Sequence, residues 1–386
     1  MAEFEGQMSP ADFYELCTGG ERAVDVQAQL IRALVEGAEN RRLARIFDHE
    51  DLTISTIEPS AIRPLLEAQA MQIFKAAQLI FREIANCLNV ISINGPMGAG
   101  KTTVIAILNE AFKASGRKTA IVALGGEYER YNAGGDGQDT ILHSGLGIGF
   151  NRVDHAIRVT ENTGIREILW LLDPNNEDRL QSGDVMFLVE CFMAVPGSDL
   201  REKVSNLEEI VEAAEAVGVK IIFDNLLRFA NAWIHSVVRR ATELSELTVG
   251  IFGFDALDPL RNGFGTIHLF FFAKWVEELA SLQICIEDIP NPADPIERIA
   301  RGAVFDQCLP EGEAILLWTI AVAELLNIVR YSPHKDDIGR LIEQIEASDR
   351  FYKELYEEGR FRVPLLELPE IDPRLIADIK RMLGLP

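Results

Sequence analysis

The feature that most constrains this chain is the stretch from residue 89 to residue 115, where a short apolar run, a glycine-rich loop and a helix-forming segment follow one another. The run NVISI is rich in β-branched residues and leads directly into GPMGAGKT, residues 95–102. This octapeptide matches the pattern G-x-x-x-x-G-K-T, and a strand before it with a helix after it is the context in which that pattern binds phosphate. The stretch therefore predicts a nucleotide-binding α/β core.

The individual residues of this predicted phosphate loop have separate expected roles. Its glycines allow backbone N–H groups to approach phosphate oxygens closely. Lys101 is predicted to reach the β- and γ-phosphates, and the hydroxyl of Thr102 is predicted to be a ligand of Mg²⁺. We therefore expect ATP and Mg²⁺ as cofactors. The predicted cofactor-binding residues are Gly95, Pro96, Met97, Gly98, Ala99, Gly100, Lys101, Thr102 and Thr103.

Apolar runs of strand length continue after this loop and alternate with helical stretches, of which residues 200–217 are the clearest. The runs are KTAIVAL (118–124), DVMFLVE (184–190), VKIIF (219–223) and TVGIFGF (248–254). Continuous apolar runs of this length are expected of strands that are buried on both faces of a parallel sheet. The alternation predicts a doubly wound, mainly parallel P-loop NTPase core over residues 89–262.

Both flanks of this core are predicted to be helical. Residues 1–88 carry apolar side chains at helical spacing, and Ser9 followed by Pro10 is typical of the start of a helix. After Arg261 the alternation stops, and the remaining segments favour helices. The predicted organisation is a helical N-terminal region (1–88), the core, and a helical C-terminal region (263–386).

Two acidic residues close predicted core strands and are candidates for the chemistry at the loop. Glu190 closes DVMFLVE, and Asp224 follows VKIIF directly. In an open parallel sheet, ligands bind at the carboxyl ends of the strands. Glu190 is therefore a candidate catalytic base, with Lys101 as the second catalytic candidate. Asp224 is a candidate magnesium ligand together with Thr102.

These residues together resemble the type II thymidine kinase family, whose phosphate loop typically reads G-P-M-x-x-G-K-T. The family's R-Y pair is similar to Arg130-Tyr131, and its strand D-V-I-x-I-D-E is similar to DVMFLVE at 184–190. The resemblance covers residues 91–261. It implies an ATP- and Mg²⁺-dependent phosphotransferase in which Glu190 activates a hydroxyl group of a nucleoside-like acceptor.

The chain departs from that family on the acceptor side. Val189 stands where the family has the first acid of its acidic pair, and the zinc-binding cysteines of the family have no counterpart. The glycine-rich segment 125–149 is typical of a functional loop, and its candidate residues for lining an acceptor pocket are Tyr128, Tyr131 and His143. The candidate arginines for stabilising transition-state charge are Arg228, Arg239, Arg240 and Arg261.

Two other functions remain open beside the kinase. The first alternative is a P-loop ATPase that hydrolyses ATP to switch the arrangement of its helical flanks in an assembly, and Glu190 does not discriminate between the two because it could also polarise a water. The large flanks favour this alternative. The second alternative is a nucleotide-bound structural relic of a kinase, which the valine at position 189 favours.

Composition narrows the partners. The net charge of −23 makes binding to duplex nucleic acid unexpected, because phosphate contacts need clustered Lys and Arg. The five cysteines are scattered and form no C-x-x-C pair, so neither a disulfide framework nor a zinc site is expected.

The same considerations bear on location and assembly. The longest uncharged apolar run, residues 314–323, has about half the length that spans a bilayer. The first residues, MAEFEGQ, contain no apolar segment of a secretory signal. We therefore expect a cytoplasmic protein without a membrane partner. The helical flanks predict a homo-oligomer or a protein assembly.

Overall fold

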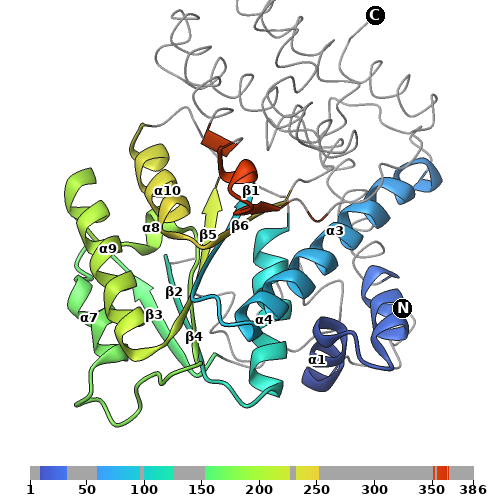
Figure 1. Ribbon diagram of the computed structural model, residues 1–386, viewed down its shortest axis with the longest axis horizontal. Helices are drawn as coiled ribbons and strands as arrows, with labels where there is room; N and C mark the ends of the chain where they lie inside the picture. The colour runs from blue at the N-terminus through green and yellow to red at the C-terminus, as the bar shows by residue number, and fades with distance from the viewer. Residues whose placement is uncertain are drawn as a thin grey trace, which may run out of the picture.

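The computed structural model has a parallel α/β fold, with helices on both faces of a single sheet (Figure 1). The seven strands lie in the order β3-β2-β4-β5-β1-β6-β7, and every neighbouring pair is parallel. The predicted α/β class with a parallel sheet is therefore confirmed. The structure describes residues 9–32, 59–95, 100–124, 153–226, 232–251, 351–352, 354–362 and 364.

Five of the seven strands coincide with apolar runs that the sequence marks as strands, and two do not. The unpredicted strands are β3, whose residues HAIRV mix polar and apolar side chains at the edge of the sheet, and β7, which is only two residues long. The strands are β1 (Val90–Gly95), β2 (Thr119–Leu124), β3 (His155–Val159), β4 (Val185–Leu188), β5 (Lys220–Leu226), β6 (Leu247–Gly250) and β7 (Phe361–Arg362).

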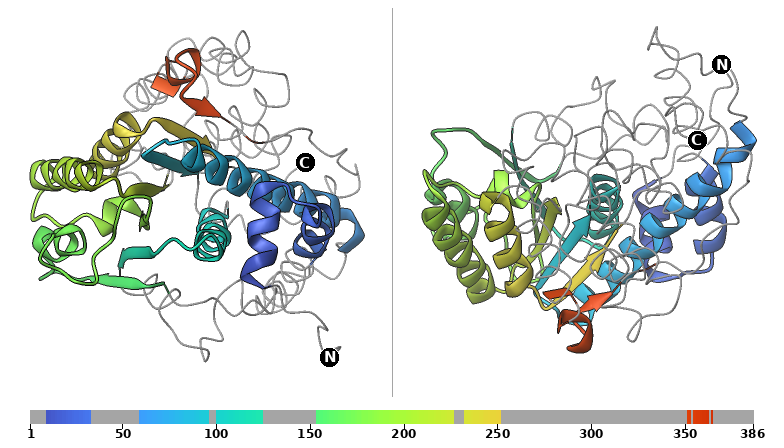
Figure 2. Two further views of the ribbon diagram at one scale, coloured as in Figure 1. Left: turned by 60° about the horizontal axis from the view of Figure 1, so that its bottom comes forward. Right: turned by 90° about the horizontal axis from the view of Figure 1, so that it is seen from above.

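The helices form two layers, one on each face of the sheet (Figures 1 and 2). The layer with α1, α3 and α4 covers one face, and the layer with α7, α8, α9 and α10 covers the other. The helices are α1 (Pro10–Thr18), α3 (Pro59–Ala85), α4 (Lys101–Ala114), α7 (Ile165–Leu169), α8 (Cys191–Ala194), α9 (Leu200–Val217) and α10 (Ala232–Leu244), with the 3₁₀ turn η1 (Trp170–Leu172) after α7.

Local sequence signals account for where two of these helices begin and end. Ser9 and Asp12 form a reciprocal capping box at the start of α1, as the Ser-Pro pair predicts. The carboxylate of Asp199 accepts the backbone N–H of Glu202 at 2.9 Å and begins α9. That helix ends at Gly218, whose φ of 77° lies in the left-handed region that glycine adopts without strain. The predicted helix at residues 200–217 is confirmed.

The N-terminal helices share a core with the helix that follows the predicted phosphate loop. The ring of Phe81 on α3 stacks on Phe112 of α4 with the centroids 4.9 Å apart, and Tyr14 of α1 meets Phe81 edge-on. On its other side Phe112 lies 6.5 Å from Phe187 of β4. This aromatic column joins α1 to the sheet through α3 and α4. Any shift of α4 therefore has to be accommodated by the N-terminal helices.

The segment 351–362 adds a strand to the sheet from far along the chain. Phe361 pairs in parallel with Thr248 of β6, and the N–H of Thr248 donates to the carbonyl of Arg360 at 2.6 Å. The sequence predicts only helices after residue 262, so the strand β7 corrects that expectation. A strand of two residues carries no period that a sequence pattern reveals. Residues 252–350 and 365–386, which hold most of the predicted C-terminal helices, lie outside the described residues.

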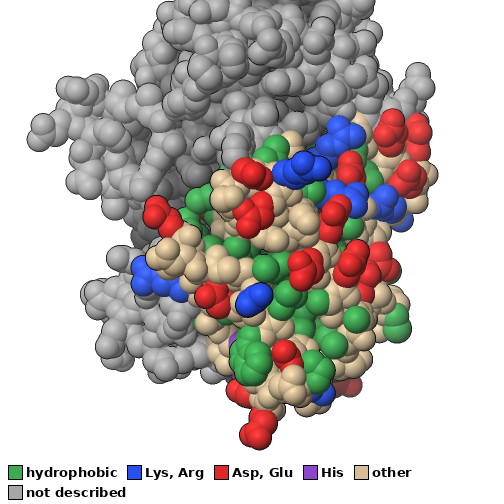
Figure 3. All heavy atoms as spheres, turned by 90° about the vertical axis from the view of Figure 1, so that its left-hand side faces the viewer, with side chains coloured by type: hydrophobic (Ala, Val, Ile, Leu, Met, Phe, Trp, Pro, Cys, Tyr) green, Lys and Arg blue, Asp and Glu red, His purple; other side chains and the backbone are tan. Residues whose placement is uncertain are grey.

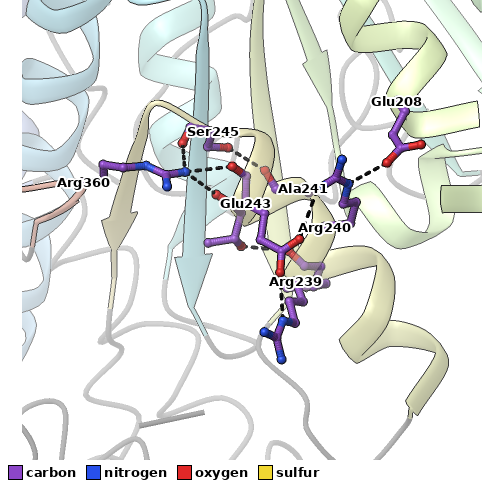
Figure 4. Close-up of polar contacts among 9 residues, drawn as sticks. Glu208, Arg239, Arg240, Ala241, Glu243, Ser245 and Arg360 are labelled. Carbon is purple, nitrogen blue, oxygen red and sulfur yellow. Dashed lines mark hydrogen bonds and ion pairs between the residues drawn. The ribbon is translucent and has the colours of Figure 1, made fainter. Parts of the chain in front are cut away.

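Arg360 holds this segment against the end of α10 (Figure 4). Its Nη2 donates to the carbonyls of Glu243 at 2.8 Å and Ser245 at 2.6 Å, and to that of Thr242 at 3.4 Å. The last carbonyls of a helix lack donors within the helix, and a cation there also interacts favourably with the helix dipole. Arg360 therefore supplies both hydrogen bonds and charge at this helix end.

The outer face over α7 and α9 is a mixed, polar surface. Figure 3 shows Asp and Glu side chains spread over its described part, with Lys, Arg and apolar groups among them. Interspersed charges of both signs are typical of a surface that faces water. None of the described helices is long and apolar enough to cross a membrane.

The Arg360 contacts predict a measurable loss of stability when they are removed. In Arg360→Met the side chain keeps much of its length but donates no hydrogen bond to α10. We expect the free energy of unfolding to fall by roughly 1–3 kcal/mol, because hydrogen bonds from a charged donor are lost. Urea denaturation measures it. The control is Arg362→Met, since among the described residues the guanidinium of Arg362 donates to the carbonyl of Phe361 alone, at 3.4 Å. Equal losses in the two variants would contradict the assignment.

Candidate functional site

The predicted phosphate loop begins at the carboxyl end of β1 and ends at the first turn of α4. Gly95 is the last residue of β1, and Lys101 is the first residue of α4. The residues between them that carry the predicted phosphate contacts, Pro96, Met97, Gly98 and Ala99, lie outside the described residues. The predicted loop is therefore preceded by a strand and followed by a helix, which is the order that the motif requires.

Gly100 is constrained in two independent ways. Its φ of 99° lies in the region that side chains rarely adopt, so another residue would be strained there. A Cβ atom at this position would also lie 2.4 Å from Cδ1 of Ile73 on α3. The backbone at the end of the loop is thus in close contact with an N-terminal helix. A side chain at this position would therefore force the Ile73 side chain to move.

Lys101 and Asp224 meet at this edge of the sheet. The Nζ of Lys101 lies 3.8 Å from Oδ1 of Asp224, and their side chains are 8% and 1% exposed. The contact follows from the strand order, because β5 is the neighbour of β1 and Asp224 is in register with Ile93. A buried charge is strongly destabilising without a partner of opposite charge, so each of these two groups depends on the other. The predicted catalytic lysine and the predicted magnesium ligand therefore lie together.

The two threonines after the lysine lie on the same first turn of α4. Thr102 is half-buried and Thr103 is buried. A hydroxyl and a carboxylate are the kinds of oxygen that Mg²⁺ prefers, so Thr102 and Asp224 suit that ion. Among the described residues no group of three or more His, Cys, Asp and Glu side chains is placed to hold a metal. A magnesium ion here would complete its shell with phosphate oxygens and water, as Mg²⁺ commonly does.

Glu190 occupies a strained position at the end of β4. Its φ of 46° and ψ of 66° place it in the left-handed region, which costs a residue with a side chain about 1–2 kcal/mol. The sequence predicts Glu190 as the last residue of the strand, but β4 ends at Leu188. Glu190 is instead the N-cap of the one-turn helix α8. Its carbonyl accepts the N–H groups of Met193 at 2.6 Å and Ala194 at 3.1 Å. Strain of this kind gathers at functional sites.

The strand order separates Glu190 from the predicted phosphate loop by one intervening strand. The strand β5 pairs with β1 on one side and with β4 on the other. Two strand spacings amount to roughly 10 Å, so the tip of β4 lies about that far across the sheet from the tip of β1. Asp224, on the intervening strand, is the acid beside Lys101. Glu190 lies at the same edge but farther away.

Val189 lies beside Asp224 on the same face of the sheet. Leu188 pairs with Phe223, so the next residues along the two strands are level with each other. Side chains alternate between the faces of a sheet, and Phe187 points toward α4, so Val189 does too. Asp224 also points toward α4, where it meets Lys101. A carboxylate therefore lies level with position 189 on the adjacent strand, while position 189 itself carries the apolar valine.

Cys191, next to Glu190, is a buried thiol rather than a nucleophile. Burial raises the pKa of Cys191 well above its usual range, the nearby Asp224 raises it further, and Lys203 opposes the shift. The thiolate is the reactive form of cysteine. The thiol therefore stays protonated at neutral pH. It packs within the apolar core between the sheet and the layer of α9 and α10.

Two of the four candidate arginines take part in ion pairs on α10 (Figure 4). Arg239 pairs with Glu243 at 2.9 Å, and Arg240 pairs with Glu208 of α9 at 2.7 Å. The first pair lies within α10, and the second links α10 to α9. The sequence patterns did not reveal the part-buried contact of Lys203 with the carbonyls of Phe192 and Val195. The other candidates, Arg228, Arg261, Tyr128, Tyr131 and His143, lie outside the described residues.

No family model matches this chain, and no curated protein matches it at a significant level.

The backbone strain at Glu190 predicts an unusual response to glycine. We expect Glu190→Gly to raise the free energy of unfolding by roughly 0.5–1 kcal/mol, because glycine adopts the left-handed region without a steric cost. Chemical denaturation of the purified variant measures the change. Glu209→Gly is the matched control, because Glu209 is exposed in the interior of α9 and glycine there should cost about 1 kcal/mol. If both variants lose stability equally, Glu190 is not strained.

Proposed function

We propose that this chain is an ATP- and Mg²⁺-dependent P-loop phosphotransferase similar to thymidine kinases, with an altered acceptor site. The observation that carries the proposal is the buried contact of Lys101 with Asp224 at the carboxyl edge of the sheet, directly beside the predicted phosphate loop. Glu190 lies at the same edge, one strand farther away. In this proposal Lys101 supplies positive charge, Asp224 a ligand for the metal ion and Glu190 a general base, which are the groups that phosphoryl transfer requires.

In the proposed reaction Lys101 exchanges one anionic partner for another. Without nucleotide its ammonium group lies near the Asp224 carboxylate; with nucleotide it contacts the β- and γ-phosphates. Asp224 and Thr102 would then hold the magnesium ion, which would neutralise charge on the phosphates. The buried charges therefore remain compensated in both states.

Glu190 is the proposed general base. The strand β5 lies between β1 and β4, so the tip of β4 is roughly two strand spacings from the predicted phosphate loop. In-line transfer needs the attacking oxygen on the side of the γ-phosphate that is opposite the leaving group. An acceptor hydroxyl bound over the tip of β5 would transfer its proton to Glu190 as its oxygen attacks the γ-phosphate and ADP leaves. The strained backbone at position 190 supports this role, because such strain is common at functional sites.

A second candidate, the switch ATPase, is favoured by the way both flanks contact the predicted phosphate-loop unit. Ile73 of α3 packs on Gly100. At the other end of the loop, the amide of Asn94 donates to the hydroxyl of Tyr352 at 2.8 Å and to Thr242 at 3.0 Å. Asn94 is fully buried and immediately precedes Gly95. A loop that changes conformation with its nucleotide would therefore disturb an N-terminal helix and the segment that carries Tyr352.

ATP turnover with and without an acceptor distinguishes the two candidates. With Mg²⁺ and a panel of nucleosides, the kinase proposal predicts that ADP forms only when an acceptor is present, and that a phosphorylated nucleoside appears in equal amount. Glu190→Gln should lower kcat by roughly 10²- to 10⁴-fold, the contribution of a general base.

Each contrary outcome has a definite meaning. Turnover that is independent of every nucleoside, and still lost in Glu190→Gln, would replace the kinase by the ATPase. Turnover that survives Glu190→Gln unchanged would remove Glu190 from the mechanism. A wild-type protein that binds Mg²⁺-ATP without turning it over would overturn both proposals and favour the structural relic.

A further inference from the structure

The helix α8 is a single turn, so its two ends are mechanically coupled. It comprises four residues and starts immediately after Glu190. The carbonyl of Glu190 accepts hydrogen bonds from Met193 and Ala194, and the N–H of Val195 donates to the carbonyl of Cys191 at 3.0 Å. These bonds connect the strained residue to the far end of the turn without an intervening flexible link. Whatever fixes the last carbonyls of α8 therefore also restrains Glu190.

Lys203 of α9 binds that far end. Its Nζ donates to the carbonyl of Val195 at 2.5 Å and to that of Phe192 at 3.3 Å. The ammonium also lies 5.3 Å from the centre of the Phe192 ring, within the range of a cation–π contact. Terminal helix carbonyls lack donors of their own and favour a cation. Lys203 thus makes three contacts with a segment of only a few residues.

The position of Lys203 is itself fixed by the loop between α8 and α9. A Cβ atom on Gly197 would lie 2.8 Å from the backbone nitrogen of Lys203, so the loop approaches α9 more closely than a side chain permits. One turn along, the amide of Asn206 donates to the carbonyl of Pro196 at 2.9 Å. Burial lowers the pKa of Lys203, and the nearby Glu202 opposes that shift. The Lys203 ammonium group is therefore partly desolvated, and its backbone on α9 is fixed by the loop that packs against it.

We propose that Lys203 is the positioning residue for Glu190: by holding the end of α8 it fixes the left-handed backbone of Glu190 at the carboxyl edge of the sheet. This inference rests on the proposed function, in which Glu190 is the base. Lys203 does not contact a substrate or a phosphate in this account. It acts through the carbonyls of Phe192 and Val195.

The kinetic test uses Lys203→Met, which keeps the apolar stem and removes the donor. We expect kcat to fall by roughly 10- to 100-fold, because a small displacement of a reacting group has an effect of that size. The KM for ATP should stay unchanged, since Lys101 and Thr102 lie two strands away. Lys203→Arg should restore part of the rate. Lys220→Met is the matched control, because the Nζ of Lys220 is also part-buried but bonds Asn89 at the other end of the sheet; its kcat should be unchanged.

A double variant separates positioning from general damage. If Lys203 acts only through Glu190, adding Lys203→Met to Glu190→Gln should cause no further loss of kcat, because the two effects are then not additive. Full additivity would overturn the proposal. So would a wild-type kcat in Lys203→Met, or equal losses of kcat in Lys203→Met and Lys220→Met.

A second measurement does not depend on turnover. Amide hydrogen exchange of the peptide covering residues 190–196 should be at least tenfold faster in Lys203→Met than in wild type, and unchanged in Lys220→Met. An unchanged rate in Lys203→Met overturns the positioning role even if the protein is an active kinase. Faster exchange in a protein that turns over no nucleotide would leave α8 anchored as described and would refute only the proposed function.

Discussion

Lys101 and Asp224 bring two opposite charges, almost completely buried, to the same edge of the sheet. Burial of either charge alone would cost several kcal/mol, so each depends on the other or on a ligand that replaces it. The contact also ties the first turn of α4 to the end of β5. The predicted phosphate loop spans from β1 to that same turn, and β1 pairs with β5, so the contact restrains the loop at the α4 end and indirectly at the β1 end. A bound triphosphate would provide the lysine with an alternative anion, and a bound cation would do the same for the aspartate.

The order of the strands gives each acid a different position around this contact. Because β5 lies between β1 and β4, Asp224 is the acid next to the lysine, and Glu190 lies one strand farther away. Val189, level with Asp224, contributes an apolar side chain where the thymidine kinase pattern has an acid. The sequence pattern places an acid on β4, whereas the structure has an acid at the same level on β5. Glu190 is in turn restrained by α8 and Lys203. The residues that flank the predicted phosphate loop are restrained by Ile73 of α3 and by Tyr352.

The parts that could be predicted from the sequence are those with strong local signals. The strand β1, the helix α9 and the capping of α1 at Ser9 were readable because apolar runs, helical spacing and capping residues depend on neighbours along the chain. The parts that could not be predicted depend on distant contacts. The strand β7 exists only through its pairing with β6, and the insertion of β5 between β1 and β4 is a property of the sheet as a whole. The left-handed backbone of Glu190 also has no residue signal, since glutamate rarely adopts it.

The most direct test of the central claim is the equilibrium affinity for a non-hydrolysable ATP analogue, measured by calorimetry with and without Mg²⁺. Wild type should bind the analogue more tightly with Mg²⁺ than without it. In Asp224→Asn this increase in affinity should be smaller by roughly 10- to 100-fold, which is the effect of losing one charge-assisted contact. Asp184→Asn is the matched control, because Asp184 is also buried but accepts the N–H groups of Lys118 and Gln181 at the opposite edge of the sheet. It should keep the full effect of Mg²⁺. No binding by wild type, or an equal response to Mg²⁺ in both variants, would contradict the account.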